Sequence, residues 1–384
     1  MKGKQPRVVD NTSNFETIII GCGIAGASLA YFLAERDVSD ILILEREEQP
    51  GYHATGRSAA VLVELDLVPS ILELKLLGGQ FLRNPPSGFS DNPLLQKSGI
   101  LITFQGPLWE QARQMVPGLK QSGVAVNILS QEETVSMIPV VSPENFDGAV
   151  LLPEDGHIDV NELLWSYLKH ARHRGAQLRC QEEVLSIRVD RERCFNVITS
   201  AGEYRSRWVI NAAGAWAEKI RRLVGPSPVQ LTPRRRTIIT FAAPDGLYVK
   251  NWPLVADLSN ALYFSPESAG LMASPMDEDP MAPCDARPDE LTVAQTIERL
   301  NQLTPRLVPK AITNKWAGLR TFAPDQAMVV GEDPVVKGFF WLSGQGGAGI
   351  ETSPAVGRIA SGLILDGRTR LMDVRPISPA RFTD

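Results

Sequence analysis

The sequence predicts an α/β fold in which a parallel sheet is interleaved with a second domain built on a mixed or antiparallel sheet. Two short apolar segments, 17–20 and 41–44, enclose a glycine-rich turn and a helical stretch, which is the order of a βαβ unit. Segments 237–241, 252–256 and 262–264 follow one another as strands with only turn residues between them, which is typical of antiparallel pairing. The signals of the two sheets alternate along the chain, so we expect discontinuous domains.

The composition excludes several classes of protein. A chain of 384 residues is long enough for two or three folding units. Its 39 basic and 44 acidic residues give a net charge of −5, which removes the general electrostatic case for nucleic acid as a partner. No stretch approaches the roughly 20 apolar residues of a membrane helix, so we expect no membrane span. Four cysteines and an opening without the apolar core of a signal peptide favour a reducing, cytoplasmic location.

We expect residues 1–14 to form a loose tail, and the first strand to lead into a nucleotide-binding turn. That turn reads Gly21-Cys22-Gly23-Ile24-Ala25-Gly26, in which the first glycine permits a tight turn, the second lets backbone approach a pyrophosphate and the third packs helix on strand. Glu45 ends the second strand, where a carboxylate can accept hydrogen bonds from a ribose diol. The pyrophosphate is expected at the N-terminus of the helix 25–35, because free N–H groups and the helix dipole attract negative charge there.

An inserted lobe interrupts the nucleotide-binding unit. After a helix at 69–82 and a loop, the lobe is expected from 99 to about 143, before signals of the first domain return. An NAD domain usually continues as one run of βαβ units, so the interruption favours a flavin nucleotide. The remaining expected elements are helices at 109–116, 131–137, about 159–175, 293–303 and 352–365, and strands at 100–104, 184–189, 195–199, 207–211 and 338–343.

Three motifs in this order resemble one known family. They are the glycine turn with Glu45, the segment Gly51-Tyr52-His53-Ala54-Thr55-Gly56-Arg57-Ser58-Ala59-Ala60, and the late Gly344-Gln345-Gly346-Gly347. From residue 17 to about 365 the chain resembles the FAD-dependent D-amino acid oxidase (DAO) family, and within it the bacterial D-arginine dehydrogenases. The resemblance implies oxidative deamination of D-amino acids, in which hydride passes from Cα to flavin N5 and the imino acid hydrolyses to a 2-oxo acid and ammonia. Either a quinone or O2 could be the electron acceptor.

The resemblance also implies how the domains and the cofactor are arranged. A Rossmann-like FAD-binding domain would comprise 15–83, 145–225 and 321–384, and a substrate-binding domain would comprise 84–144 and 226–320. We expect FAD to be noncovalent, because no cysteine lies in sequence near the late glycine loop. The residues expected to bind FAD are Gly21, Gly23, Ile24, Ala25, Gly26, Glu45, Arg46, Thr55, Arg57, Ser58, Ala60, Val184, Ala213, Gly214, Trp216, Gly318, Gly344, Gly346, Gly347, Ala348, Gly349 and Ile350.

The substrate site implied by the resemblance centres on two arginines. Arg236 and Arg320 would hold the substrate carboxylate, since a guanidinium can bind it through two parallel hydrogen bonds. Tyr263 would add a phenolic donor and His53 would orient substrate or flavin, and these four form the expected catalytic group. The other residues expected to line the substrate pocket are Gln345, Asp91, Leu254 and Ala256. Apart from the resemblance, the arginine run 234–236 is typical of a solvated basic face, and we expect Arg234 and Arg235 to remain so.

The preferred substrate stays open at this level. The D-arginine branch carries a lid tyrosine where this chain reads Val61-Leu62-Val63-Glu64-Leu65, and a further tyrosine where it has Ala348. Leu254 and Ala256 predict an apolar wall, whereas Asp91 or Glu64 would attract a cationic side chain. Two alternatives therefore remain: an FAD-dependent oxidoreductase of secondary amines (sarcosine or glycine type) or 2-hydroxy acids, and a flavin-binding subunit without turnover. We expect no metal site, because the histidines of the 170–173 helix face have no third ligand nearby in sequence.

Overall fold

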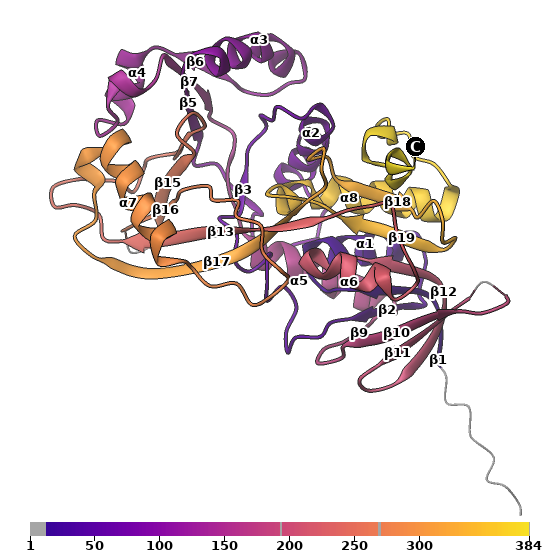
Figure 1. Ribbon diagram of the computed structural model, residues 1–384. Helices are drawn as coiled ribbons and strands as arrows, with labels where there is room; N and C mark the ends of the chain where they lie inside the picture. The colour runs from indigo at the N-terminus through magenta and orange to yellow at the C-terminus, as the bar shows by residue number, and fades with distance from the viewer. Residues whose placement is uncertain (1–12, 193, 268–269, 384) are drawn as a thin grey trace, which may run out of the picture.

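The computed structural model describes residues 13–192, 194–267 and 270–383. In these residues the chain forms two eight-stranded sheets and one three-stranded sheet, with the two large sheets in neighbouring parts of the molecule (Figure 1). β1 (Ser13–Ile20) begins inside the segment expected to be a loose tail, because Ser13 already pairs with Tyr204 of β12. Residues 1–12 of that segment lie outside the described residues.

The first large sheet is parallel at its centre. β1 pairs in parallel with β12 on one side and β2 on the other, and β9 and β19 extend the parallel part. Its strands are β10 (Val184–Val189), β11 (Phe195–Thr199), β12 (Glu203–Asn211), β1, β2 (Ile41–Leu44) and β9 (Gln177–Arg179), with β19 (Phe339–Ser343) beside β12 and β18 (Val329–Glu332) beside β19. The helices near it are α1 (Ile24–Ala34), α2 (Pro69–Arg83), α5 (Val160–His173), α6 (Ala217–Arg222) and α8 (Gly349–Asp366).

Both faces of this sheet are covered, which explains why its strands are apolar throughout. Ile19 belongs to the core formed with α1, α2, α5 and α8. Ile18 and Ile20 point to the opposite face and pack with residues of β10, β11 and α6. Successive side chains of a strand alternate between faces, so a strand buried on both sides must be apolar at every position.

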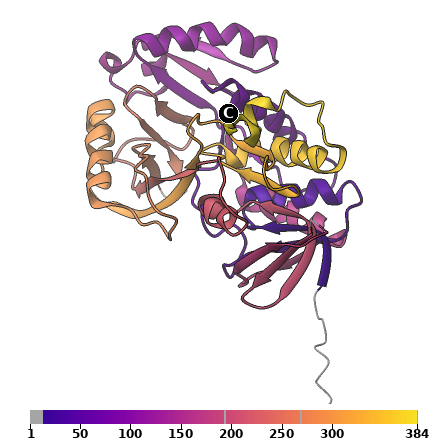
Figure 2. The same cartoon turned by 45° about the vertical axis from the view of Figure 1, so that its right-hand side comes forward.

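The second large sheet is mixed and almost entirely antiparallel. Only β14 and β5 pair in parallel. In spatial order its strands are β17 (Ile312–Phe322), β13 (Thr232–Phe241), β16 (Gly270–Ser274), β15 (Leu262–Glu267), β14 (Leu254–Asp257), β5 (Ile100–Phe104), β7 (Gly148–Leu152) and β6 (Asn127–Leu129). α3 (Pro107–Gln121), α4 (Gln131–Met137) and α7 (Glu290–Leu303) lie around this sheet, on the side of the molecule away from the first sheet (Figure 2).

Short elements complete the chain. β3 (Val61–Leu62), β8 (Gly156–Ile158) and β4 (Leu95–Gln96) form the three-stranded sheet. The 3₁₀ turns are Pro143–Asn145, Gly214–Trp216, Pro305–Leu307, Arg375–Ile377 and Pro379–Phe382. Among the described residues no helix is both long and apolar enough to span a membrane.

The fold class expected from the sequence is confirmed, and a few elements differ from it. α3 continues through Pro117 to Gln121, where a helix ending at 116 was expected. The short strands β3, β4, β6, β7, β8, β9, β16 and β18 were not predicted, because none of them alternates cleanly over enough residues. The 11-residue strand β17 was not predicted either. β13 and β17 form one long antiparallel pair that reaches from the second sheet toward β18 and β19 (Figure 1).

Candidate active site

The turn between β1 and α1 requires glycine at two positions. Gly21 has a φ of +103°, and a Cβ there would lie 2.5 Å from the carbonyl oxygen of Ala212 on the loop after β12. A Cβ on Gly26 would lie 2.1 Å from the carbonyl oxygen of Gly21, so glycine allows α1 to pack directly on the strand end. As a result α1 begins at the carboxyl edge of the sheet without a side-chain cap, and its first residues line a pocket.

Glu45 and Thr55 fix the pocket wall beside this helix start. The two carboxylate oxygens of Glu45 accept hydrogen bonds from the backbone N–H groups of Cys22 at 2.9 Å and Glu47 at 3.0 Å. Thr55 Oγ1 accepts a hydrogen bond from the backbone N–H of Ile24 at 3.0 Å. An open helix N-terminus next to a fixed carboxylate fits a dinucleotide, with phosphate at the helix and a ribose diol at the acid.

The pocket runs from this turn to the start of α8 and includes the 318–321 segment of β17. Three of the residues expected to bind FAD, Gly26, Ala60 and Ala348, do not line it and are buried beside it. The others all line it: Gly21, Gly23, Ile24, Ala25, Glu45, Arg46, Thr55, Arg57, Ser58, Val184, Ala213, Gly214, Trp216, Gly318, Gly344, Gly346, Gly347, Gly349 and Ile350.

The late glycine loop brings a second helix start to the same pocket. Gly346 has a φ of +52°, and a Cβ there would lie 2.6 Å from the ring of Phe322. Its N–H donates to the carbonyl of Thr321 at 2.9 Å, which ties the loop to the end of β17. α8 begins at Gly349 without a side-chain cap, so its positive end faces the pocket. In the same loop the side-chain Nε2 of Gln345 is buried and has no partner among the described residues.

Four of the predicted substrate residues, Arg236, Tyr263, Leu254 and Ala256, do not line this pocket, whereas Arg320 does, and these five share one face of the second large sheet. Arg320 on β17 lies opposite Arg234 on β13, and Arg236 is two residues along that strand, so the three side chains point the same way. Tyr263 on β15 lies opposite Ala256 on β14, and the register through β16 puts both on this face. Leu254, two residues before Ala256, joins them.

Arg320 is enclosed in the pocket wall with a free hydrogen-bond donor. Its Nη1 is buried and lacks a partner among the described residues, while Nη2 reaches the backbone carbonyl of Arg57 at 3.4 Å. Burial and then the positive charge of Arg236 lower the pKa of Arg320 to about 10, and Tyr263 and Asp277 act in the opposite direction. The guanidinium is still charged at neutral pH. A bound anion would therefore offset both the free-energy cost of burying this charge and its repulsion by Arg236.

Arg236 and Arg234 share one acidic partner at the edge of this face. Arg236 donates through Nε to the backbone carbonyl of Asp277 at 3.0 Å and through Nη2 to Glu278 at 2.9 Å. Arg234 donates through Nη1 to the other carboxylate oxygen of Glu278 at 2.7 Å, and its Nε is buried without a partner in the described part of the chain. Two of the three guanidinium groups on this face therefore share a single glutamate carboxylate.

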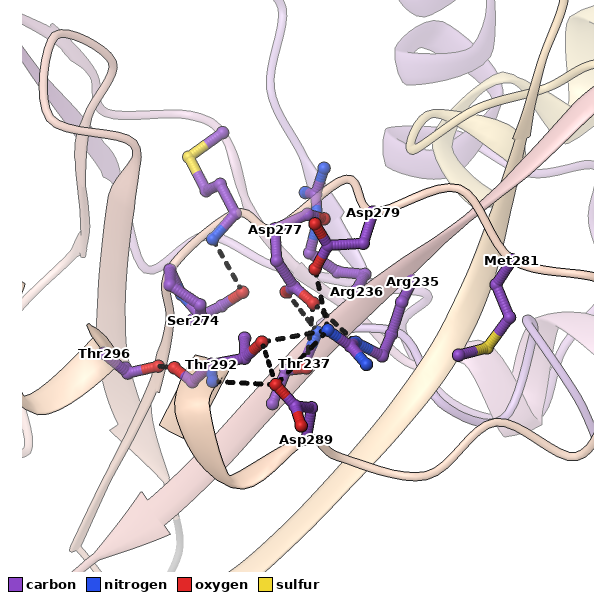
Figure 3. Close-up of polar contacts among 12 residues, drawn as sticks. Arg235, Arg236, Thr237, Ser274, Asp277, Asp279, Met281, Asp289, Thr292 and Thr296 are labelled. Carbon is purple, nitrogen blue, oxygen red and sulfur yellow. Dashed lines mark hydrogen bonds and ion pairs between the residues drawn. The ribbon is translucent and has the colours of Figure 1, made fainter. Parts of the chain in front are cut away.

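Arg235 points to the opposite face and binds acidic and hydroxyl partners there through Nε and Nη2. Its guanidinium donates to the carboxylates of Asp277 at 3.2 Å and Asp279 at 2.7 Å, and to Thr292 Oγ1 at 2.9 Å (Figure 3). Asp277 also accepts hydrogen bonds from the backbone and side chain of Thr237. This arginine is buried and holds β13 to the start of α7, so it is not part of a solvated basic face as expected.

His53 lines the pocket, as expected, and its polar contacts place it beside Glu47 and Arg46. Its Nε2 contacts the carboxylate of Glu47 at 2.8 Å and Arg46 Nη2 at 3.3 Å, and its ring centre lies 4.5 Å from that of Trp216. The segment folds back because the N–H of Gly51 donates to the carbonyl of Cys22. His53 thus lies at the Glu45 end of the pocket, and its polar contacts are there and not with Arg236 or Arg320.

The structure also places both candidate acids outside the pocket. The Asp91 side chain is 81% exposed and pairs with Lys169 of α5 at 3.5 Å, because the loop after α2 packs against that helix. Glu64 is buried in a bidentate ion pair with Arg83, which also bonds Asp155. Lys169 holds Asp91 at the surface and Arg83 holds both carboxylate oxygens of Glu64, so neither acid is available to a cationic substrate side chain.

Some pocket residues could not be found from the sequence. Residues 275–289, which we call the β16–α7 connection, run along the edge of β13, where Arg234 forms an antiparallel bridge with Pro280, and supply Asp277 and Glu278. Cys284, in the same connection, is exposed and lines the pocket, although no cysteine adjoins the late glycine loop in sequence. Within the described residues, no cluster of three or more metal-ligating side chains occurs.

The chain matches a known protein family over most of its length. The model of the DAO family, described as FAD dependent oxidoreductase, matches residues 16–363. The chain is 27% identical to FAD-dependent oxidoreductase domain-containing protein 1 of Mus musculus, covering 100% of this chain and 88% of the relative. It is 24% identical to mitochondrial dimethylglycine dehydrogenase of Rattus norvegicus, covering 96% of this chain but only 45% of that enzyme.

Solved structures show the same fold at low sequence identity. L-proline dehydrogenase from P. horikoshii superposes with a TM-score of 0.86 and 20% identity, covering 97% of this chain and 98% of its own. Glycine oxidase from Geobacillus kaustophilus has a TM-score of 0.81 and 23% identity, covering 96% and 99%. The names of these proteins refer to dimethylglycine, L-proline or glycine, or only to the cofactor, and none of them is a D-arginine dehydrogenase. The family model supports the DAO family, and the solved structures support the fold.

Proposed function

Because the chain belongs to the DAO family of FAD-dependent oxidoreductases, we propose that it oxidises the carbon next to nitrogen in a small, carboxylate-bearing amine of the sarcosine or glycine type. The observation that carries this proposal is Arg320, a buried guanidinium with an unpartnered Nη1 in the wall of the cofactor pocket. A buried, charged donor without a partner is stabilised by an anionic ligand, and small amino acids provide a carboxylate as that anion. This replaces D-amino acid deamination as the preferred function.

The pocket described above fits FAD. Two uncapped helix starts and the fixed carboxylate of Glu45 meet around one elongated pocket, which matches the phosphates and ribose of a dinucleotide. When bound, FAD supplies the acceptor for the two electrons and the hydrogen removed from the substrate. We infer noncovalent binding, although Cys284 lines the pocket.

The residues of this chain would hold and orient the substrate. Arg320 and Arg236 would bind its carboxylate, with Tyr263 as a nearby phenolic donor. Leu254 and Ala256 pack in one apolar cluster with Leu65 from the loop after β3, and this wall would exclude water. Since the expected lid tyrosine is absent and aliphatic residues fill this side, a small substrate is favoured over one with a long side chain.

The relatives support the same substrate class. One curated relative is a dimethylglycine dehydrogenase, and the similar structures are those of an L-proline dehydrogenase and a glycine oxidase. D-arginine would need an acidic partner for its guanidinium, and the surface position of Asp91 removes the candidate for that role. An N-alkylated or cyclic amino acid makes no such demand.

The test is anaerobic reduction of the purified holoprotein by a substrate panel. Sarcosine, dimethylglycine, L-proline and glycine are compared with D-arginine, D-methionine and a 2-hydroxy acid, and bleaching of the flavin absorbance is followed. Fastest bleaching by sarcosine, dimethylglycine, L-proline or glycine supports the proposal, and fastest bleaching by the 2-hydroxy acid would overturn it. Fastest bleaching by a D-amino acid would overturn it, and no bleaching by any compound would indicate a flavin-binding subunit.

A separate measurement tests the mode of FAD binding. Acid precipitation should release free FAD into the supernatant. Flavin that stays with the pellet, and is lost from it in Cys284→Ser, would instead identify a covalent bond to the cysteine that lines the pocket.

A further inference from the structure

The carboxylate of Glu278 binds two arginines in the way a substrate carboxylate would. One oxygen accepts from Arg236 at 2.9 Å and the other from Arg234 at 2.7 Å. Arg236 is also one of the two arginines assigned above to the substrate carboxylate. A ligand carboxylate that takes Arg236 must therefore share its guanidinium with Glu278 or displace it.

The charge on this face favours a second anion. Arg234, Arg236 and Arg320 share one face of the β13–β17 pair, and Glu278 is the glutamate that pairs with two of them. Asp277 contributes its backbone carbonyl to Arg236, but its carboxylate is bonded on the other face by Arg235 and Thr237. The buried Nη1 of Arg320 and Nε of Arg234 have no partner in the described part of the chain.

The Glu278 side chain can move away from Arg236 without disturbing the backbone of the β16–α7 connection. Its side chain is 38% exposed, and ion pairs at that exposure are weak because water competes for both partners. The β16–α7 connection is held independently of it: Asp277 and Asp279 bind Arg235, and Asp285 binds Arg57. Movement of one glutamate side chain would therefore expose Arg236 while the backbone stays in place.

We propose that Glu278 is an internal carboxylate that competes with the substrate carboxylate for Arg236 and so determines the specificity of the site. This rests on the proposed function only in taking the ligand to be a carboxylate. An amine without a carboxylate cannot displace Glu278 and is excluded. A ligand with a carboxylate gains the free donor of Arg320 as well as Arg236, which compensates for the contact that Glu278 loses.

The experiment measures binding of acetate, a simple carboxylate with no oxidisable amine, to the FAD-loaded protein. Binding is followed by the shift of the flavin absorbance and by calorimetry, for wild type and Glu278→Gln. The matched control is Asp279→Asn, which removes a carboxylate from the same connection but from the Arg235 face. Glu278→Gln should lower the acetate dissociation constant about tenfold, equivalent to about 1.4 kcal/mol, and the control should stay within about twofold.

A second variant tests whether the gain depends on the shared guanidinium. In the double variant Glu278→Gln with Arg236→Met, the tighter binding of acetate should disappear. An unchanged or higher acetate dissociation constant in Glu278→Gln would overturn the inference, since Glu278 would then position the arginines or bind the ligand itself. Because acetate is not oxidised, the result stands apart from the proposed function, which fails only if the panel of amines is not turned over.

Discussion

Both faces of strand β13 carry arginines, but the number of acidic partners that bind these arginines differs between the faces. On one face Arg235 is surrounded by Asp277, Asp279 and Thr292, which bind its Nε and Nη2. On the other face, Arg236 and its neighbour Arg234 share one partly exposed glutamate, and Arg320 across the strand pair keeps a buried donor free. The supply of acidic partners, and not the residue type, separates an arginine that holds the fold from one available to a ligand.

The largest effect is expected from Arg320→Met, which removes the guanidinium with the free donor. Transition-state stabilisation should fall by about 2–5 kcal/mol, the range for truncating one partner of a desolvated charge pair. Thermal stability and FAD content should stay near wild type, because the protein itself gives this charge no carboxylate partner. Steady-state kinetics and melting curves on the same preparation check both parts. A variant that loses stability while its activity per bound flavin is unchanged would place Arg320 with the structural arginines.

Arg235→Met should show the opposite pattern. Removing this guanidinium leaves the buried carboxylate of Asp277 without its cation, so we expect a loss of about 3 kcal/mol in the free energy of unfolding. The activity per bound flavin of the remaining folded protein should change little, since Arg235 lies on the face opposite Arg236 and Arg320 and does not line the pocket. Denaturant unfolding and flavin-normalised kinetics provide the comparison. A large fall in activity at unchanged stability would show that the two faces do not divide the roles in this way.

Local features of the site could be predicted from the sequence, whereas contacts between distant segments could not. The glycine turn at 21–26 and Glu45 could be placed because a tight turn, a helix start and a strand end are local features. The pairing of Arg236 with Glu278 could not, since the partner comes from a connection about 40 residues away whose path depends on the whole sheet. The surface position of Asp91 could not be predicted for the same reason, since Lys169, its partner, lies 78 residues further along the chain.

The buried cluster around Arg83 has more acidic than basic groups, and its effect on stability should depend on pH. Around Arg83, the carboxylates of Glu64 and Asp155 share one guanidinium, and burial, with the nearby Glu64 charge, raises the pKa of Asp155 from 3.8 to about 7. Between about pH 4 and pH 7 the folded protein then keeps a proton that the unfolded chain releases, so stability should fall as the pH rises through this window and level off above it. The slope should approach about 1 kcal/mol per pH unit.

Asp155→Asn is the variant that isolates this contribution. Its stability should depend less on pH between 4 and 7 than that of wild type, even if the variant is less stable overall, because Asn cannot titrate. The buried Glu351, whose pKa burial raises to about 7, should keep part of the slope in both proteins. Denaturant unfolding at a series of pH values measures it. An identical slope in wild type and variant would mean that Asp155 is ionised throughout.

The smallest effect is expected from Arg234→Ala. Arg234 lies on the same face as Arg236 and Arg320, but its side chain is 29% exposed and its carboxylate partner is the partly exposed Glu278, so the pair contributes about 0–1 kcal/mol. Arg236, at 12% exposure and close enough to Arg320 to lower the pKa of that residue, should cost more when truncated in the same way. The two alanine variants are compared by their kinetics on the best substrate of the panel, at low and at high salt.

The loss of activity in Arg234→Ala should become still smaller at high salt, because salt screens exposed ion pairs. If Arg234→Ala instead proved the more costly of the two at both salt concentrations, the substrate carboxylate would lie nearer the edge of the arginine face than Arg236, and Glu278 would compete with it mainly at Arg234.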